Sequence, residues 1–370
     1  MKLRLAFFSY CIFIFSSCFS QVIDSFPNDS LARNEKLNFL PIPIIMNSPE
    51  TSFGFGGGGI FTFKASKKDT SLRTSSADIV ALYTLNQQLV FASEGSLYLP
   101  KENYIIKYQA SFSKYPDLFW GIGNNTPASN QESYSYTQAY FHPEIVRKVL
   151  SKFFLGLNYE IQHVLKVDRN ANDLFDQENV TGRNGGPISG IGITAAWDKR
   201  NRAFSPDKGE FVQFYARHYN HLLGSDFEFS DFSVDARKYF KTFHRQVLVF
   251  QAISKMTKGS VPFRSLASLG GSSLMRGYYE GRFRDFNMFA FQAEYRVPLW
   301  RRFGMVIFTG IGEVSSALKY YCLNGIKYSY GGGLRYALKK KDRLNLRIDY
   351  GFGQDFRRDK GAYLLISEAF

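Results

Sequence analysis

Cysteine is scarce in this sequence. Three of its 370 residues are cysteine, and two of these, Cys11 and Cys18, lie within the first twenty positions. We expect those positions to be removed during export, for the reasons given below. Cys322 is then the only thiol of the mature chain, so no intrachain disulfide can form. The fold must be held together by noncovalent contacts.

Long apolar runs are also missing. After Gln21, no run of apolar residues approaches the roughly 20 that a membrane-spanning helix requires, which excludes a helical membrane protein. Yet aromatic residues make up 17% of the chain, with 37 Phe and 23 Tyr, while the mean hydropathy is −0.22. A transmembrane β-barrel accounts for both values, because lipid-facing and lumen-facing side chains alternate along its strands and the average conceals the apolar half.

Residue constellations for catalysis or metal binding are absent too. The five histidines show no metal-ligand spacing, and His218 and His221 fit a strand end and a loop better than a site. Strand counting brings together no Ser–His pair and no pair of carboxylates. We therefore expect no catalytic residue, no metal and no cofactor.

The charge is unbalanced, with 46 Lys and Arg against 32 Asp and Glu and a net charge of +14. No basic helix or nucleic-acid motif accompanies it, so we do not expect nucleic acid as a partner. The basic residues alternate with apolar ones in predicted strands or lie in turns such as 339–341. We expect them to line a lumen and to face lipid headgroups.

The N-terminus has the layout of a secretory signal peptide. Lys2 and Arg4 precede the mostly apolar run Leu5–Phe15, and three serines follow before Gln21. Cleavage before Gln21 makes residues 1–20 the signal peptide. Attachment of lipid at Cys18 is the alternative. Residues 21–37 are polar and too few to fold alone, so we expect them to form a short periplasmic tail.

Alternation of apolar and polar residues dominates from about residue 38 to residue 370. The segments Tyr104–Phe112 and Leu344–Tyr350 show it clearly. Many such segments have bilayer-crossing length and aromatic flanks, which favours a membrane barrel over a soluble sandwich. We predict an all-β fold, an antiparallel transmembrane β-barrel of about sixteen strands that occupies residues 38–370. The predicted strands are 38–46, 52–65, 76–86, 88–99, 103–115, 133–148, 152–165, 187–198, 209–219, 226–240, 245–257, 287–299, 303–314, 327–338, 342–353 and 361–370.

The connections between these strands differ in length. If the N-terminus is periplasmic, the long connections all fall on the outer side and the short turns on the inner side, as in bacterial barrels. The long connections lie near 116–132, 166–186, 258–286, 315–326 and 354–360. Outer and inner connections therefore alternate consistently along the whole predicted barrel.

The longest outer connection contains the segment Gly270–Tyr278, which ends in Arg276, Gly277 and Tyr278. Here the sequence resembles the BamA/TamA family of bacterial surface antigens. The sixth outer loop of that family folds into the barrel and presents an Arg-Gly-aromatic tip to the lumen wall. The resemblance implies an inward-folded sixth extracellular loop in this chain. An ordinary exposed loop charge is the alternative interpretation of Arg276.

Other segments extend the resemblance over nearly the whole mature chain. Asp198, Arg200, Pro206 and Gly209 match the family's Asp-x-Arg…Phe-x-Pro-x-x-Gly connection. The final Phe370 resembles the C-terminal signal by which barrels are delivered for assembly.

A loop arginine inside a narrow lumen needs hydrogen-bond acceptors there, because an unpaired buried guanidinium is costly. Glu294 faces inward by alternation and matches a family partner of that arginine. In the next strand the family usually has Phe-x-Asp-x-Gly, whereas this chain has Phe308–Gly312 with no acidic residue. Asp349, which also faces inward by alternation, is a candidate substitute.

Pro41 and Pro43 lie in the first predicted strand. Residues two apart direct their N–H groups to the same side, so both prolines remove donors toward one neighbour. If that neighbour is the last strand, the seam that closes the barrel is short of hydrogen bonds. This candidate seam would lie between Ile44 in the first strand and residues Ile366 to Phe370 in the last. Such a seam suits lateral opening, by which the family is thought to assemble or move clients. Alternatively, the prolines only mark the start of a short strand.

The resemblance implies a protein of the Gram-negative outer membrane that inserts outer-membrane proteins or translocates polypeptide. Its expected surroundings are outer-membrane lipid and lipopolysaccharide, and its possible partners are client polypeptides or accessory periplasmic proteins. A tail of residues 21–37 cannot itself capture clients. The alternative is a pore or transporter for small solutes that is gated by the inward loop. An enzyme is the least favoured class.

Overall fold

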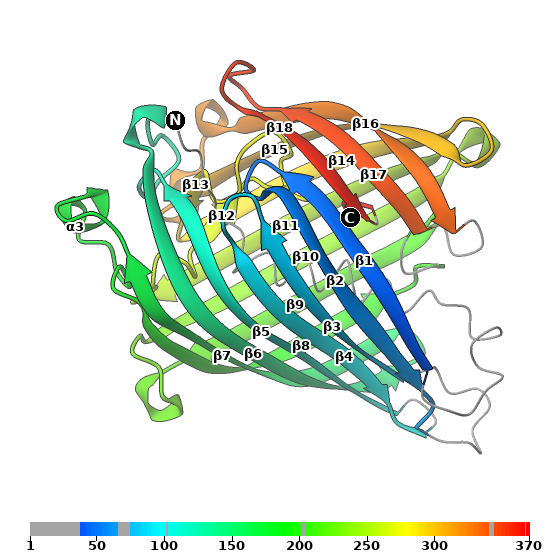
Figure 1. Cartoon of the computed structure of the whole chain (residues 1–370), viewed down its shortest axis with the longest axis horizontal. Coiled ribbons are helices and arrows are strands. Elements are labelled where there is room, and N and C mark those ends of the chain that lie inside the picture. The colour runs from blue at the N-terminus through cyan, green and yellow to red at the C-terminus, as the bar shows by residue number, and fades with distance from the viewer. Residues whose placement is uncertain (1–37, 66–74, 101–102, 202–204, 340–343, 367) are drawn as a thin grey trace.

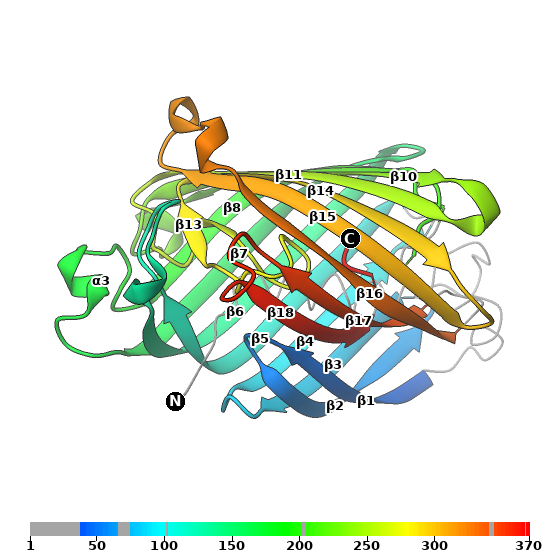
Figure 2. The ribbon, with the colours of Figure 1, turned by 90° about the horizontal axis from the view of Figure 1, so that it is seen from above.

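The structure is a computed structural model that describes residues 38–65, 75–100, 103–201, 205–339, 344–366 and 368–370. The expected signal peptide (1–20) and periplasmic tail (21–37) lie outside the described residues. Sixteen antiparallel strands of the described chain close into one barrel, shown in Figure 1 and from above in Figure 2. The predicted fold class is confirmed.

The wall strands follow one another in chain order, and the ring is closed by the pairing of β1 with β18. They are β1 (Asn38–Ser48), β2 (Ser52–Phe63), β3 (Ser75–Thr84), β4 (Leu89–Tyr98), β5 (Tyr104–Phe119), β6 (Glu132–Leu150), β7 (Phe153–Asp168), β8 (Gly186–Asp198), β9 (Gly209–Tyr219), β10 (Phe229–Lys241), β11 (Val247–Gly259), β14 (Asn287–Pro298), β15 (Phe303–Ser315), β16 (Lys327–Lys339), β17 (Leu344–Phe352) and β18 (Lys360–Ile366). Most boundaries lie within a few residues of the predicted ones.

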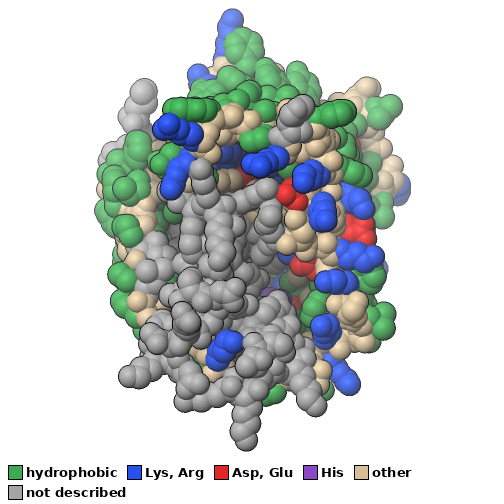
Figure 3. Space-filling model, turned by 90° about the vertical axis from the view of Figure 1, so that its right-hand side faces the viewer, with side chains coloured by type: hydrophobic (Ala, Val, Ile, Leu, Met, Phe, Trp, Pro, Cys, Tyr) green, Lys and Arg blue, Asp and Glu red, His purple; other side chains and the backbone are tan. Residues whose placement is uncertain are grey.

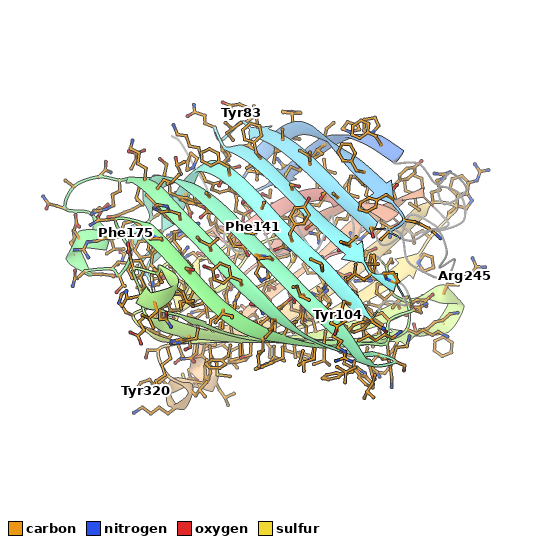
Figure 4. All side chains as sticks on the ribbon, turned by 90° about the horizontal axis from the view of Figure 1, so that it is seen from below. Tyr83, Tyr104, Phe141, Phe175, Arg245 and Tyr320 are labelled. Atoms are coloured by element: carbon orange, nitrogen blue, oxygen red, sulfur yellow. The ribbon has the colours of Figure 1, made fainter. Side chains whose placement is uncertain are left out.

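Side-chain alternation explains the two faces of the wall. Along β3, Ile79 and Tyr83 are exposed on the outside, whereas Val80 and Leu82 are buried inside. Figure 4 shows Tyr83, Tyr104 and Phe141 on the outer face, where all three are exposed. An apolar, aromatic outer face is what contact with hydrocarbon requires. Among the described residues, no helix is long and apolar enough to cross a membrane.

The two ends of the barrel differ. One end carries the long connections and is called the long-loop end, and the other carries the short turns and is called the short-turn end. Figure 4 places Phe175 and Tyr320 at the long-loop end and Arg245 at the short-turn end. The short turns carry exposed cations, among them Lys152, Lys241 and Arg302. Figure 3, which views the short-turn end, shows Lys and Arg side chains along the upper and right-hand parts of the rim and hydrophobic side chains on the outer wall. This is the distribution expected for cations at the level of lipid headgroups.

Short helices lie in the connections. Among the elements that lie wholly within the described residues, α3 (Leu174–Gln177) and most 3-10 turns lie at the long-loop end, and one 3-10 turn lies at the short-turn end. The 3-10 turns are Ala128–Asn130, His221–Leu223, Phe243–Arg245, Leu318–Tyr320 and Leu323–Gly325. Asp173 caps α3, because its side chain accepts a hydrogen bond from the backbone N–H of Asp176.

The connection 260–286, hereafter loop 6, lies inside the barrel. It contains a two-stranded sheet of β12 (Ala267–Leu269) and β13 (Phe283–Asp285), which was not predicted. Figures 1 and 2 show these strands within the outline of the wall. The predicted inward loop is thus part of the fold. The sheet of loop 6 packs against β11, β14 and β15, and other residues of the loop reach the opposite wall, where Arg264 donates to Gln138 on β6.

Aromatic side chains close the long-loop end on the opposite wall. Phe119 of β5 stacks on Phe175 of α3 at a ring-centroid distance of 4.2 Å, and Phe263 of loop 6 lies edge-on to Phe175 at 5.0 Å. All three rings are buried. These rings pack loop 6 against β5 and α3 at the long-loop end.

The last strand is shorter than predicted. We predicted a strand over 361–370, but β18 ends at Ile366, and Glu368, Ala369 and Phe370 lie buried inside the barrel. Figures 1 and 2 both place the C-terminus within the barrel outline. Continued strand geometry would point Glu368 to the lipid side, because Tyr363 of β18 points inward and positions 364, 366 and 368 alternate with it. A carboxylate facing hydrocarbon is costly, which explains the turn inward.

Candidate functional site

The tip of loop 6 rests directly on the backbone of β17. Gly277 has a φ of +116°, and a Cβ at this position would lie 2.5 Å from the carbonyl carbon of Phe352. On the wall side, a Cβ at Gly351 would lie 2.6 Å from the carbonyl oxygen of Arg276. Both contacts require glycine. The Arg-Gly pair therefore suits the loop to this wall.

Arg276 projects from that tip into a buried charged cluster. Its Nη2 lies 2.5 Å from Glu294 Oε2 on β14, and its Nη1 lies 2.6 Å from Asp349 Oδ2 on β17. The guanidinium carbon also lies 3.4 Å from the ring centroid of Phe308. All three charged side chains are at most 1% exposed. Arg276 is thus not an exposed loop charge, and the structure places both candidate carboxylates beside it.

These contacts belong to a closed ring of six charged side chains with alternating sign. In order around the ring they are Arg276, Glu294, Arg296, Glu368, Arg335 and Asp349. Arg296 Nε lies 2.8 Å from Glu294 Oε1, and Arg335 contacts Glu368 at 2.7 Å and Asp349 at 2.5 Å. The weakest link joins Arg296 to Glu368 at 3.9 Å. The ring connects loop 6, three wall strands and the C-terminal segment.

Several members of this cluster were missed by the sequence reasoning. Arg296 and Arg347 lie two residues from Glu294 and Asp349, so the same alternation places them on the lumen face. Arg347 Nη1 lies 3.5 Å from Asp349, and its Nη2 donates to the carbonyl oxygen of Ser272 in loop 6. The period-two pattern could therefore have found these two arginines.

The neighbours of Arg276 anchor the tip further. The backbone N–H of Gly277 donates to the hydroxyl of Tyr363 on β18 at 2.9 Å. The hydroxyl of Tyr278 donates to the carbonyl oxygen of Tyr328 and accepts from the N–H of Gln354. Loop 6 is thus attached to β16, β18 and the connection after β17.

Gly310 occupies the position at which the family usually has its second acid. A Cβ at Gly310 would lie 3.0 Å from the sulfur of Met275 in loop 6. The N–H of Met275 donates to Gln292 Oε1 on the adjacent strand. The space that an acidic side chain would occupy thus holds a methionine, and Asp349 on β17 pairs with Arg276.

The family-like connection at 198–209 is a turn at the short-turn end. Arg200 donates from Nε and Nη2 to the two carboxylate oxygens of Asp198, at 3.0 and 2.8 Å. Gly209 has a φ of +110°, and a Cβ there would lie 2.3 Å from the carbonyl oxygen of Lys199. Pro206 is buried. These contacts give the four matched residues a role in shaping the turn between β8 and β9.

The closing seam of the barrel is poorly paired. β1 pairs with β2 along its whole length, whereas Asn47 and Leu364 are the one registered pair with β18 among the residues that the structure describes. Pro41 and Pro43 are exposed on the outer face of the part of β1 that has no β18 partner. This arrangement distinguishes the seam from the other pairs of neighbouring strands.

Two details of the expected seam were wrong. Phe370 is not part of it, because the chain turns into the lumen after Ile366. Ile44 and Ile366 are not opposite each other either, since the register of Asn47 with Leu364 aligns Ile366 with Ile45, and the Ile44 side chain is buried inside. The only pair in register that the structure describes is Asn47 and Leu364.

A cavity lies between loop 6 and the opposite wall. It holds about 150 Å³ of free volume and is lined by residues of β6, β7, β9, β10, β11 and loop 6. Arg217 pairs there with Glu160 and with Asp231 at 2.7 Å, and Arg237 pairs with Asp235 at 2.5 Å. Within the described ranges, no group of three His, Cys, Asp or Glu residues could hold a metal ion.

Comparison with known proteins agrees with this geometry. A model of the Omp85 superfamily domain matches residues 55–370. None of the curated proteins matches the sequence. Among solved structures, BamA from Haemophilus ducreyi lacking POTRA domains 1–3 is similar, with a TM-score of 0.61 and 13% identity over 90% of this chain and 70% of that chain.

Two further structures are CdiB proteins. CdiB from Acinetobacter baumannii has a TM-score of 0.57 and 12% identity over 90% of this chain and 60% of its own. CdiB from Escherichia coli has a TM-score of 0.56 and 11% identity over 90% of this chain and 68% of its own. At such identities the likeness shows the common barrel fold.

The match to the superfamily covers most of the chain, and the fold agrees with it. At the level of the superfamily, the function is insertion or translocation of polypeptide at the outer membrane, and its members are transporters rather than enzymes. The chain belongs to the Omp85 superfamily and is a β-barrel of the Gram-negative outer membrane.

Proposed function

We propose that this barrel inserts or translocates client polypeptides and that the seam between β1 and β18 is the site at which clients are handled. The observation that supports the seam most is its pairing, because one registered pair joins these strands while neighbouring strands elsewhere pair along most of their length. Unpaired backbone groups on a strand edge are a template for an incoming strand. Client outer-membrane polypeptides are therefore the expected substrates.

Loop 6 has a supporting role in this proposal. Its tip binds β14, β16, β17 and β18, which lie on one side of the seam. These strands are thereby held as a unit while β1 is connected to the rest of the wall through β2. On the other side of the seam, the N–H of Glu280 in loop 6 donates to Glu50 in the β1–β2 turn, so opening between β1 and β18 breaks this bond and the one registered pair. Capture of clients in the periplasm falls to an accessory periplasmic protein, because a tail of residues 21–37 is too short for it.

The seam is tested by locking it. In a Cys322→Ser background, Asn47→Cys and Leu364→Cys place a disulfide across the one registered pair. The matched control is Ala236→Cys with Ala252→Cys, a registered pair between β10 and β11 on another part of the wall. Each variant is reconstituted in phospholipid vesicles, and folding of a small unfolded outer-membrane barrel protein is followed by its heat-modifiable gel mobility.

We expect the seam disulfide to reduce client folding to the rate in empty vesicles, and reductant to restore it. The control disulfide should leave the rate unchanged. Equal client folding with the seam oxidised and reduced would overturn the proposal.

A second candidate is a pore for small solutes, and the cavity beside loop 6 favours it. Its walls carry paired charges and tyrosines, which suit polar solutes. Planar-bilayer conductance separates the two functions when measured before and after deletion of residues 270–278. A barrel that stays silent in both forms contradicts the pore.

A further inference from the structure

The last three residues of the sequence occupy a defined position in the lumen. Glu368, Ala369 and Phe370 are 6%, 7% and 5% exposed, although they follow a strand at the seam. They take no part in the β-ladder that joins β17 to β18. Side chains of the wall, and not a neighbouring strand, therefore hold this tripeptide.

The wall recognises the acidic side chain with two donors. Arg335 Nε on β16 donates to Glu368 Oε2 at 2.7 Å, and Asn345 Nδ2 on β17 donates to Glu368 Oε1 at 2.6 Å. Both carboxylate oxygens are thus satisfied by separate strands. Charge-assisted hydrogen bonds of this length are strong and selective for a carboxylate.

The wall recognises Phe370 in two further ways. Arg296 Nη2 on β14 donates to the carbonyl oxygen of Phe370 at 2.6 Å. Ala369 and Phe370 also pack in an apolar cluster with Tyr239, Val247 and Val249 of β10 and β11. Carboxylate, backbone and ring are therefore bound at three separate places, which makes the tripeptide a ligand of the wall.

The site would remain charged if the tripeptide left. The lumen cluster contains four arginines, at 276, 296, 335 and 347, and three carboxylates, at 294, 349 and 368. Without Glu368, four positive charges face two negative ones. Arg335 would still pair with Asp349, and Arg296 would still pair with Glu294, so both arginines would stay in position. The emptied site favours a new carboxylate, because an excess of buried positive charge is costly.

A polypeptide in the lumen can reach this site. Ala369 lines the cavity beside loop 6, so the bound tripeptide borders free space. Arg237 and Gln251 of β10 and β11 line the same cavity. Ser273 and Leu274, which precede the loop tip, line it as well, so a second chain in the cavity would meet both the tripeptide and loop 6.

We infer that the lumen wall of β10, β11, β14, β16 and β17 is a binding site for a peptide segment with an acidic residue two positions before a phenylalanine. The chain's own Glu368–Phe370 occupies the site, and the same segment of another polypeptide replaces it. This inference rests on the proposed function, since it concerns a polypeptide inside the barrel. It assigns that function a recognition element separate from the seam.

Peptide binding tests the inference. The probe is a fluorescein-labelled Ser-Glu-Ala-Phe peptide, the control probe is Ser-Gln-Ala-Ala, and binding is measured by fluorescence anisotropy on refolded barrel in detergent. A variant that lacks residues 368–370 should bind the probe at least about tenfold more tightly than the wild type, since the competing segment is gone. The control probe should bind weakly to both.

Folding of the shortened variant is checked by heat-modifiable mobility. A full-length variant with Glu368→Gln and Phe370→Ala weakens the resident segment without shortening the chain, and it too should bind the probe more tightly than the wild type. In this variant, Asn345→Ala should weaken probe binding, because Asn345 donates only to the carboxylate in this site. Asn158→Ala is the matched control, since that buried lumen asparagine bonds to Thr194 on another wall.

The outcomes separate this site from the proposed function. Equal binding of both probes, or no gain of binding in either variant, overturns the site. A loss of client folding on locking the seam, together with absent probe binding, leaves the proposed function standing and removes the site. Tight, Asn345-dependent probe binding in a barrel that still folds clients when its seam is locked leaves the site standing and removes the proposed function of the seam.

Discussion

Replacement of Arg276 by glutamine removes the residue that attaches loop 6 to the wall. The substitution breaks two buried ion pairs, at 2.5 Å to Glu294 and 2.6 Å to Asp349, and the contact with the Phe308 ring. Breaking one partner of a buried charge pair costs about 3–5 kcal/mol. Because each carboxylate keeps another arginine, we expect the lower part of that range, about 3 kcal/mol.

The assay is urea unfolding of the barrel in phospholipid vesicles. Trp120 lies 5.2 Å from the ring of Tyr279 in loop 6, so its fluorescence reports release of the loop. Trp197→Phe and Trp300→Phe make it the only tryptophan of the chain. The fluorescence of Trp120 and the heat-modifiable mobility then distinguish release of the loop from unfolding of the whole barrel.

Two comparisons sharpen this test. Arg276→Lys keeps the charge but cannot bridge both carboxylates in the same fork geometry, so its effect should be intermediate. Arg301→Gln changes an exposed turn residue and should alter stability by less than about 0.5 kcal/mol. A change below about 1 kcal/mol for Arg276→Gln would refute the reasoning, because it would show that the ring does not hold the loop.

Two further changes test the loop and its surroundings. Gly277→Ala should release the tip at a cost of about 2 kcal/mol or more, since a Cβ would lie 2.5 Å from Phe352. Gly123→Ala has a similar φ of +124° with open space around it, so Trp120 should report a smaller effect there. Burial raises the pKa of Glu50, in the β1–β2 turn, to about 7, and its Oε1 accepts from the N–H of Glu280. The folded state therefore binds more protons between pH 4.5 and 7, and stability falls as the pH rises through this window; the contribution of Glu50 is on the order of 3 kcal/mol. In urea titrations at pH 5 and pH 8, Glu50→Gln should reduce that fall, and the carboxyl of Glu280, whose pKa is also raised by burial, should account for part of the remainder.

The strands of the wall could be predicted because the bilayer imposes a strict rule. Each wall residue faces either hydrocarbon or the lumen, so a segment such as Tyr104–Phe119 shows alternation between its two faces over many residues. β12 and β13 were missed for the opposite reason. They span only three residues each, which is too short for an alternation of apolar and polar residues to be recognised.

The lumen cluster was less accessible to sequence reasoning. The resemblance pointed to Arg276 and Glu294, and alternation pointed to Asp349. The ring also requires Arg335 and Glu368, which come from separate parts of the chain and meet only when the barrel closes. No local pattern links two residues that a wall strand and the C-terminal segment bring together.

The inward turn of the C-terminus nevertheless had a signal in the sequence. Tyr363 faces the lumen, so a continued strand would place Leu364, Ile366 and Glu368 on the lipid side. Two of these side chains suit hydrocarbon and the third does not, which means that the strand should end between Ile366 and Glu368. At the same time, the lumen cluster around Arg276 has four arginines and only two carboxylates when Glu368 is left out. The turn of Glu368 into the barrel removes its charge from the lipid. It also lowers the excess of positive charge in the lumen cluster, so one change of chain direction relieves both costs.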